Sequence, residues 1–284
     1  MNNQTALNQF QDYLKRKKKS KSTLIAYIAD IKQLISLAGN RDISSLGSED
    51  YNEIYKEIKK SYSAIKTVAR KINTYRTFVK FLFDRKVIEE DFSGSIVHPK
   101  YIQPKPRTLT LSEINKIREI SKDNDKIYTM IELLVQTGVR ISELANLQVQ
   151  DITFDRVNPN IHINQQDSIP PRNVPMTDKI FNVLKAYISE NQPEKFVFCT
   201  KKNKRMEIRN IRASLTRYFQ KAKVSGASVN DFRNAFVVFQ LSNGVPLKEL
   251  SDIVGHKSLA TTERYLELLS KKYKEREFRG LKEL

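Results

Sequence analysis

The chain has 284 residues, which is enough for two modest domains or one large one, each with a core of its own. Its 50 lysine and arginine residues exceed its 32 aspartate and glutamate residues, so the formal net charge is +18. Hydrophobic residues make up 39% of the chain, which excludes a disordered protein and indicates a folded one. A folded chain with this excess of positive charge is expected to bind a polyanion.

The sequence also excludes several classes of protein and site. Its longest apolar runs, such as IELLVQTGV from Ile131, are much shorter than the roughly 18 to 20 residues that a membrane span needs. The N-terminus MNNQTALNQF has no apolar stretch typical of signal peptides, so we expect a soluble cytoplasmic protein with no membrane partner. One cysteine, Cys199, and three scattered histidines cannot form a zinc cluster. We therefore expect chemistry without a metal, unless carboxylates bind a divalent ion.

Helical periodicity runs through the first 88 residues. We expect four helices, over residues 3–20, 22–39, 49–60 and 63–88, because apolar residues recur there at intervals of three and four. The last helix also carries a basic stripe, which consists of Lys66, Arg70, Lys71, Arg76 and Lys80. A solvated helix face is the simplest interpretation of such a stripe. Together with the run KRKKKSKS and the net charge, however, it predicts contact with phosphates.

A proline-rich segment interrupts the helical pattern. The stretch HPKYIQPKPRTLT, residues 98–110, has three prolines within eight positions, which exclude a helix and favour extended chain. We predict a linker over residues 99–108, between one domain at residues 1–98 and a second at residues 109–284. Lys105 and Arg107 would suit a strap that lies along phosphates.

The second half mixes helical and extended patterns. A buried helix is expected to end at Gly138, and a further helical turn follows it. Residues 151–176 have Asn-Pro and Pro-Pro pairs and alternating β-branched residues, which predict a small antiparallel sheet. The remaining helices are expected over residues 177–190, 208–223, 229–244 and 246–255. The expected fold class is therefore mostly α, with one small sheet in the second domain.

Two arginines in the second half follow or lie within apolar segments that would hold them rigidly. Arg140 comes directly after the buried helix and its glycine, and Arg233 lies in the apolar stretch VNDFRNAFVVFQLSNG. Two fixed guanidinium groups can each bind the oxygens of one phosphate and stabilise the charge of its transition state. Taken alone, a single arginine of this kind more often forms a structural ion pair, such as Arg140 with Glu143.

Three sequence boxes occur in order. TGVRISEL, NDFRNAF and VGHKSLATTERYL resemble the successive boxes of the tyrosine recombinases, the phage integrase, Xer and Cre family. The helices before the linker are similar to that family's core-binding domain. The resemblance implies a four-helix, SAM-like, DNA-binding domain, followed by an α+β catalytic domain with a small antiparallel sheet.

The resemblance also assigns roles to four residues. It implies that Tyr265 is the nucleophile, that Arg140 and Arg233 bind the scissile phosphate, and that His256 hydrogen-bonds it. A phenol with a pKa of about 10 is a poor nucleophile until nearby cations favour the phenolate, but it is then a good leaving group. The phosphotyrosyl bond thus keeps the energy needed to reseal DNA, so the resemblance implies no ATP, metal or other cofactor.

Some positions depart from the family's pattern. Asn230 stands where the second box normally opens with histidine or lysine, and Asn234 stands where it closes with histidine. An amide cannot accept and return a proton, but it can still hydrogen-bond a phosphate, so Asn230 stays a candidate catalytic residue. The family's hairpin lysine, which protonates the leaving 5′ oxygen, aligns with Asp167. Arg172 and the cluster at residues 201–205 are candidates for a substitute cation, and the sequence does not rank them.

The compact size and the second box are most similar to the TnpI-type cointegrate resolvases of replicative transposons. This similarity implies a site-specific recombinase that acts through a 3′-phosphotyrosyl intermediate and a Holliday junction, with no small-molecule substrate. It would bind double-stranded core sites as a homodimer and pair them as a homotetramer. An integrase of another mobile element is an alternative, and so is a DNA-binding accessory protein with impaired catalysis.

The C-terminal segment carries an apolar face after Tyr265, formed by Leu266, Leu269, Tyr273 and Phe278. In the family the corresponding segment docks on a neighbouring subunit, so we expect an oligomerisation tail here. The alternative is a surface helix that folds back on its own domain.

Overall fold

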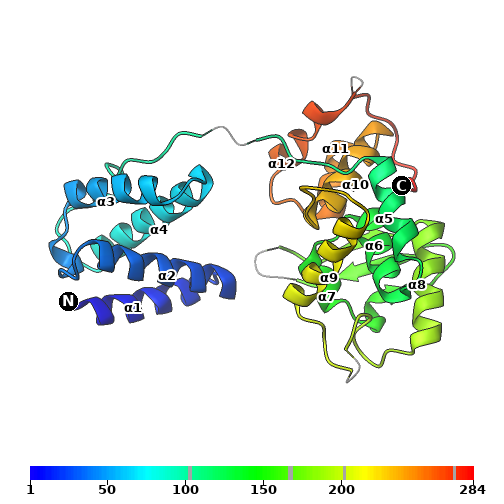
Figure 1. The fold of residues 1–284 in the computed structure, drawn as a ribbon, viewed down its shortest axis with the longest axis horizontal. Helices are drawn as coiled ribbons and strands as arrows, with labels where there is room; N and C mark the ends of the chain where they lie inside the picture. The colour runs from blue at the N-terminus through cyan, green and yellow to red at the C-terminus, as the bar shows by residue number, and fades with distance from the viewer. Residues whose placement is uncertain (102–103, 166–168, 201–202, 271–272) are drawn as a thin grey trace. The chain divides into compact units, whose positions relative to one another are not determined.

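The computed structural model describes residues 1–101, 104–165, 169–200, 203–270 and 273–284 (Figure 1). The chain divides into two compact units, Met1–Gln103 and Pro104–Leu284. The division falls within the proline-rich segment, where proline disfavours helix. Residues 102 and 103 of the expected linker lie outside the described residues.

The N-terminal unit consists of helices packed around one apolar core. Its α-helices are α1 (Asn3–Arg16), α2 (Lys21–Leu37), α3 (Ser48–Ser61) and α4 (Ile65–Asp84). The side chains of Asn2 and Ser20 accept hydrogen bonds from backbone amides of the first turns of α1 and α2, which fixes where these helices begin. Phe10 and Phe78 meet edge to face at 4.9 Å between ring centroids in the core. The expected four-helix domain is confirmed.

A buried ion cluster holds α2 to α4. Asp30 is only 1% exposed, and it accepts hydrogen bonds from Lys71 Nζ at 2.8 Å, from Thr74 Oγ1 at 3.1 Å and from the Arg70 guanidinium. The expectation that Lys71 contacts phosphates is wrong, because its ammonium group is buried against this carboxylate. Arg76 donates instead to the backbone carbonyl of Ile96. Of the expected stripe, Lys66, Arg70 and Lys80 have exposed side chains, and Arg70 and Lys80 face Asp30 and Asp91.

The C-terminal unit is mostly helical, with one small sheet. Its α-helices are α5 (Leu111–Ser121), α6 (Asp125–Thr137), α7 (Ile141–Asn146), α8 (Asp178–Asn191), α9 (Ile208–Lys221), α10 (Asn230–Ser242), α11 (Leu247–Val254) and α12 (Leu259–Glu263). The sheet has antiparallel strands in the order β1 (Ile152–Thr153), β2 (Asn160–Ile163) and β3 (Arg172–Pro175). Ile161 pairs with Val174, and both point into the core. The mostly α fold class with a small antiparallel sheet is confirmed.

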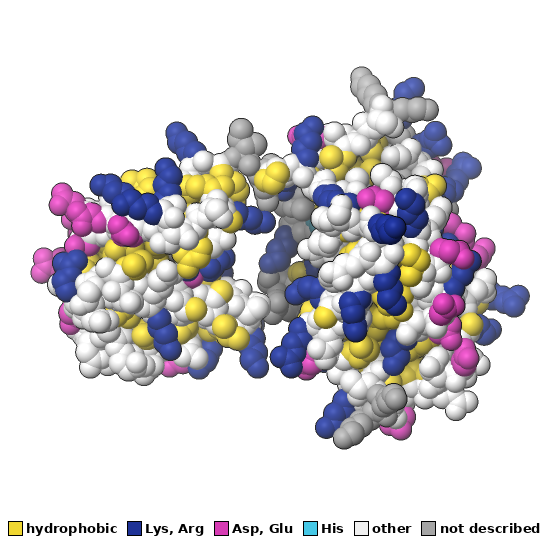
Figure 2. All heavy atoms as spheres, in the orientation of Figure 1, with side chains coloured by type: hydrophobic (Ala, Val, Ile, Leu, Met, Phe, Trp, Pro, Cys, Tyr) yellow, Lys and Arg dark blue, Asp and Glu magenta, His cyan; other side chains and the backbone are white. Residues whose placement is uncertain are grey.

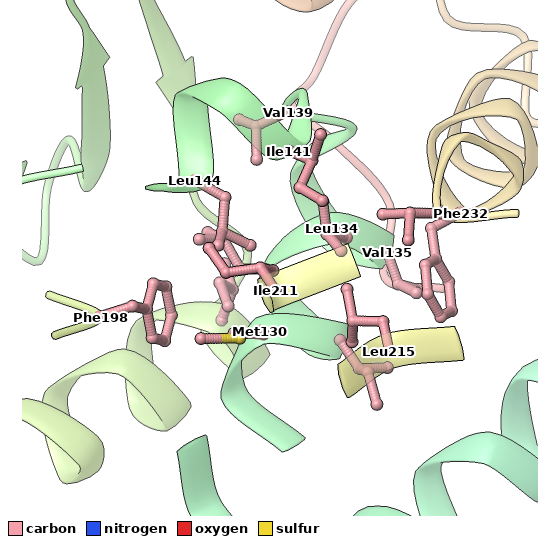
Figure 3. Close-up of a cluster of buried hydrophobic side chains, with 14 of the residues drawn as sticks. Met130, Leu134, Val135, Val139, Ile141, Leu144, Phe198, Ile211, Leu215 and Phe232 are labelled. Atoms are coloured by element: carbon pink, nitrogen blue, oxygen red, sulfur yellow. The ribbon is translucent and has the colours of Figure 1, made fainter. Parts of the chain in front are cut away.

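The core of this unit gathers around α6. Met130, Leu134 and Val135 of α6 lie in one apolar cluster with Ile211 and Leu215 of α9 (Figure 3). Burial is almost continuous along α6, and it includes polar side chains such as Glu132 and Gln136 as well as the apolar ones. None of the helices in the described part of the chain has the length and apolarity needed to cross a membrane.

The C-terminal segment folds back on its own unit. Gln240 exchanges two hydrogen bonds with the backbone of Lys282, at 2.7 and 3.0 Å, and Gln136 does the same with the backbone of Leu284, at 2.6 and 3.1 Å. Both glutamines are fully buried, so the segment satisfies amides that water does not reach. Phe278 packs partly buried against the core. The segment therefore completes its own unit, and its described part after Leu268 is not helical, unlike the helix considered from the sequence.

Candidate active site

Arg140 is positioned by the turn that ends α6. Gly138 has a left-handed backbone with φ of 62°, and a Cβ atom there would lie 2.4 Å from Phe236 Cδ1, so only glycine fits. Two residues later Arg140 is the N-cap residue of α7. Its amide donates to Glu143 Oε2 at 2.8 Å, and its Nη1 donates to Glu143 Oε1 at 3.0 Å. The structural ion pair considered for Arg140 thus exists, and it fixes the direction of the guanidinium.

Glu143 also holds an arginine of the sheet. Arg172, at the start of β3, donates from both terminal nitrogens to the Glu143 carboxylate, at 2.9 Å each, and from Nε to the Ile253 carbonyl at 2.7 Å. Burial raises the pKa of the Glu143 carboxyl, but the hydrogen bonds and charges of Arg172 and Arg140 outweigh it and lower the pKa overall. These bonds hold the Arg172 guanidinium against Glu143 and leave its side chain only 9% exposed, which argues against it as the substitute for the family's hairpin lysine. Asp167 lies outside the described residues.

Arg233 of α10 points at the same place as Arg140. Its Nη1 donates to the Gly138 carbonyl at 2.6 Å and its Nη2 to the Val254 carbonyl at 2.8 Å. Arg140 donates to the Val254 carbonyl at 3.2 Å and to the Gly255 carbonyl at 2.6 Å. Burial and then the charge of Arg140 lower the pKa of Arg233. Two guanidinium groups from distant parts of the chain therefore converge on the carbonyl group at the end of α11.

His256 comes directly after this point of convergence. Gly255 ends α11 in the left-handed conformation, with φ of 68°, and turns the next residue toward the arginines. The His256 ring nitrogen Nδ1 lies 2.8 Å from Thr262 Oγ1, which fixes the ring. Burial, and then the charges of Arg233 and Arg140, lower the pKa of His256 to about 3. The imidazole is therefore neutral at neutral pH, and Nε2 is the ring nitrogen that Thr262 leaves available.

Tyr265 lies just beyond the end of α12. It precedes the 3₁₀ turn Leu266–Leu268, and its ring stacks on that of His256 with 6.1 Å between centroids. Its hydroxyl donates to Asn234 Oδ1 at 2.7 Å. Burial raises the pKa of the Tyr265 phenol, although the charges of Arg233 and Arg264 oppose the increase. The expected nucleophile is thus next to the expected phosphate-binding residues.

The second box contributes through Asn234 rather than through Asn230. Asn230 is exposed at the start of α10, and no hydrogen bond of its side chain is found among the described residues. One helical turn later, Asn234 accepts from Tyr265 and donates to the Arg107 carbonyl at 2.7 Å and to Asp231 Oδ1 at 3.3 Å. The sequence identified Asn234 only as a departure from the family's pattern. The one further feature of the sequence that points to Asn234 is its position three residues after Asp231 on the same helix, which lets the two side chains hydrogen-bond.

Lys105 and Arg107, the linker residues expected to contact DNA, are both paired. Arg107 donates to Glu113 at 2.9 Å and to Asp231 at 3.4 Å, whereas the exposed Lys105 lies 3.5 Å from Glu267. Arg107 is therefore part of the surroundings of the site as well as a candidate for DNA contact. Arg205, from the cluster considered for the missing cation, bonds to Asn146, and residues 201 and 202 lie outside the described residues.

The site holds a tyrosine, a neutral histidine and cationic arginines around one point. Within the described ranges, no group of three or more histidine, cysteine or acidic side chains is placed to hold a metal ion. Fixed arginines can bind the non-bridging oxygens of a phosphate, and a tyrosine beside them can attack its phosphorus. The arrangement suits phosphoryl transfer to a tyrosine.

Comparison with protein families agrees with this geometry. The model of the phage integrase family matches residues 107–272, and that of its N-terminal SAM-like domain matches residues 7–86. The chain belongs to the phage integrase family. The expectation of a tyrosine recombinase is confirmed at the level of the family, and the matches cover both units.

Individual relatives resemble the chain over nearly its whole length. It is 30% identical over 275 residues to a tyrosine recombinase of Pseudothermotoga lettingae, which covers 93% of each chain. It is 26% identical over 274 residues to the tyrosine recombinase XerA of Pyrococcus furiosus, which covers 95% of this chain and 91% of that one. The fold is similar to that of lambda integrase in a dimer bound to a core site, with a TM-score of 0.77 at 14% identity over 98% of this chain and 81% of the other.

Proposed function

We propose that this member of the integrase family is a site-specific DNA recombinase that cuts and rejoins duplex DNA through a 3′-phosphotyrosyl intermediate. Tyr265 is the nucleophile. Arg140 and Arg233 bind the scissile phosphate, and His256 donates a hydrogen bond to it from Nε2. As the Tyr265 oxygen attacks phosphorus, it loses its proton and the phosphotyrosyl bond forms. The bond from phosphorus to the 5′ oxygen breaks and this oxygen takes up a proton, and the reverse reaction reseals the strand.

The convergence of both arginines on the Val254 carbonyl carries this proposal. Arg233 and Arg140 come from segments 93 residues apart in the sequence, yet both donate to this one oxygen, at 2.8 and 3.2 Å. A neutral carbonyl uses only part of the hydrogen-bonding capacity of two guanidinium groups. A phosphate bound beside it would accept the remaining bonds, which are stronger because both partners are charged.

The basic face of α9 supports a DNA partner. Its exposed residues include Arg209, Arg212, Arg217 and Lys221, and the helix contains no acidic residue. None of these four side chains forms an ion pair with another described residue. Figure 2 shows lysine and arginine side chains gathered on the C-terminal unit in the region where Figure 1 places α9. Such a face can neutralise several DNA phosphates.

The test is covalent capture of DNA. A nicked duplex taken from the DNA beside the gene is incubated with the wild-type protein and with Tyr265→Phe in EDTA, and adducts are separated on a denaturing gel. We expect an adduct from the wild type alone, because the nick lets the cleaved end diffuse away and traps the phosphotyrosyl bond. Phenylalanine keeps the ring and its packing but has no oxygen to attack with.

Binding without an adduct from either protein would reject tyrosine catalysis. It would favour the second candidate function, a DNA-binding accessory protein. The observation for this function is the second box, in which Asn230 replaces a histidine or lysine and Asn234 replaces a histidine. An adduct from both proteins would show that another residue is the nucleophile.

We further propose that the recombinase resolves transposon cointegrates, with a dimer on each core site and a tetramer in the paired complex. Solved structures of lambda integrase include a dimer on a core site and a tetramer on a Holliday junction, which supports this assembly. A plasmid with two directly repeated sites tests the role. A resolvase converts it to two circles, whereas an integrase of another element joins sites on separate molecules.

A further inference from the structure

The hydrogen bonds of Asn234 determine which way its amide faces. The nitrogen Nδ2 donates to the Arg107 carbonyl and to Asp231 Oδ1, at 2.7 and 3.3 Å, and both of these groups are acceptors. Reversing the amide would place its oxygen against two other oxygens. The oxygen Oδ1 must therefore face Tyr265, 2.7 Å from the phenol oxygen.

This orientation also determines the state of the phenol. An amide oxygen can only accept a hydrogen bond, so the Tyr265 oxygen must be the donor and must carry its proton. An amide oxygen is not a base and cannot take that proton away. While the contact lasts, the phenol is therefore neutral, and its O–H bond points at Asn234 instead of at a group that could accept the proton.

We propose that Asn234 is a positioning residue that holds Tyr265 as a neutral hydrogen-bond donor in the free protein and has to release it before DNA is cleaved. This inference rests on the proposed function, because it concerns the nucleophile of that reaction. It gives a functional role to Asn234, which stands where the family has a histidine. The amide keeps the nucleophile protonated until the site is assembled.

Residues 104–110 form a strap that orients the Asn234 amide toward Tyr265. The Arg107 carbonyl binds the Asn234 amide, and the Arg107 side chain is anchored by Glu113 and by Asp231. If the Arg107 guanidinium moved from these carboxylates to a DNA phosphate, the Arg107 carbonyl would move with it. The amide would then lose the partner that fixes its orientation, and Tyr265 would be released where DNA is bound.

The test measures the ionisation of Tyr265 directly. Tyrosine labelled with ¹³C at Cζ is incorporated into the full-length protein without DNA, and the Tyr265 signal is identified by its loss in Tyr265→Phe. The charged groups around the phenol, Arg140, Arg233, Arg264 and Asp231, stay the same in all variants, and His256 is neutral at the high pH of this titration. A difference between variants in the midpoint of the Tyr265 titration is therefore caused by the residue at position 234.

Two variants are expected to move the midpoint in opposite directions. Asn234→Ala removes the acceptor that favours the neutral phenol, so the midpoint should fall by about half a pH unit or more. Asn234→Asp keeps an acceptor oxygen and adds negative charge, so the midpoint should rise. The added charge of Asn234→Asp raises the midpoint whatever the role of Asn234, so the decisive variant is Asn234→Ala. A midpoint that stays the same or rises in Asn234→Ala would overturn the inference. Asn243→Ala, at the other end of α10, is the control and should keep the wild-type midpoint.

Cleavage assays separate the inference from the proposed function. With saturating protein on the nicked duplex, Asn234→Ala should form the adduct at a lower pH than the wild type and several times faster at neutral pH. A slower reaction with an unshifted pH profile would overturn the inference while leaving tyrosine catalysis in place. If no protein forms an adduct but the two titrations diverge as expected, the proposed function fails and the hold of Asn234 on Tyr265 stands.

Discussion

At the scale of single residues, His256 makes stability depend on pH. Its pKa in the folded protein is about 3, because burial and the neighbouring arginines disfavour the imidazolium, whereas an unfolded chain has an ordinary histidine pKa of about 6.5. Above the ordinary value neither state is protonated and His256 contributes nothing. As the pH falls below it, only the unfolded state binds the proton, so the folded state loses stability until the pH approaches 3.

The corresponding prediction concerns His256→Gln. Between pH 6 and pH 4 the wild type should lose up to about 1.4 kcal/mol of unfolding free energy per pH unit more than this variant, which is the effect of one proton. Urea denaturation at a series of pH values measures the difference. Parallel curves for the two proteins would show that the imidazole is protonated in the folded state.

Lys71 and Lys66 separate stability from DNA contact. Lys71→Met leaves the buried Asp30 with fewer partners, so we expect a loss of about 3 kcal/mol in the unfolding free energy with an unchanged salt dependence of DNA binding. Lys66→Met changes an exposed residue of the same helix, so stability should stay the same and the slope of log affinity against log salt should fall by about 1. An unchanged stability of Lys71→Met would contradict the buried ion cluster.

At the scale of elements, the turn after α6 decides where Arg140 lies. Gly138 and Gly226 both have left-handed backbones, but only Gly138 has the ring of Phe236 where a side chain would begin. Gly226→Ala should therefore cost about 1 kcal/mol of backbone strain. Gly138→Ala should cost about 3 kcal/mol or more, because the buried ring has to move, and it should also slow DNA cleavage. Thermal unfolding measures both costs, and equal losses would contradict the close packing of this turn.

The elements were largely predictable from the sequence, but the contacts between them were not. Apolar periodicity placed the helices, and Gly138 and Gly255 marked two helix ends at which Arg140 and His256 then appear. The three boxes brought the four expected site residues together. The pair of Arg172 with Glu143, and the bond from Asn234 to Arg107, join residues 29 and 127 positions apart. Bonds between residues so far apart in the chain leave no periodic pattern in the sequence, so they could not be predicted from it.

At the scale of the whole molecule, the C-terminal segment is bound to its own unit, and we predict that it also takes part in assembly. From the sequence we predicted that the apolar face of this segment packs against a neighbouring subunit. The hydrogen bonds of Gln136 and Gln240 with residues 282 and 284 were not predicted, because no sequence pattern marks them. The amides of Gln136 and Gln240 could form the same hydrogen bonds with this segment of another copy. This supports the proposed assembly without requiring new contacts.

Deletion from residue 271 onward tests this link. We expect single-site DNA binding to persist and cooperative binding to a two-site duplex to weaken. The free energy of unfolding should fall as well, by about 1 to 3 kcal/mol for each buried amide left without a partner. Gel shifts on one-site and two-site DNA and thermal unfolding measure these effects. Unchanged cooperativity would reject the segment as an oligomerisation element.

The shared carboxylate of Glu143 has a consequence for the purified protein. Arg140, Arg172 and Arg233 face this one carboxylate, so the site has an excess of positive charge before any DNA arrives. Small dianions should therefore accumulate there and bind the folded state alone. Sulfate would then raise the melting temperature with a logarithmic dependence on its concentration, beyond what sodium chloride of equal ionic strength does, and it would compete with DNA as a simple inhibitor.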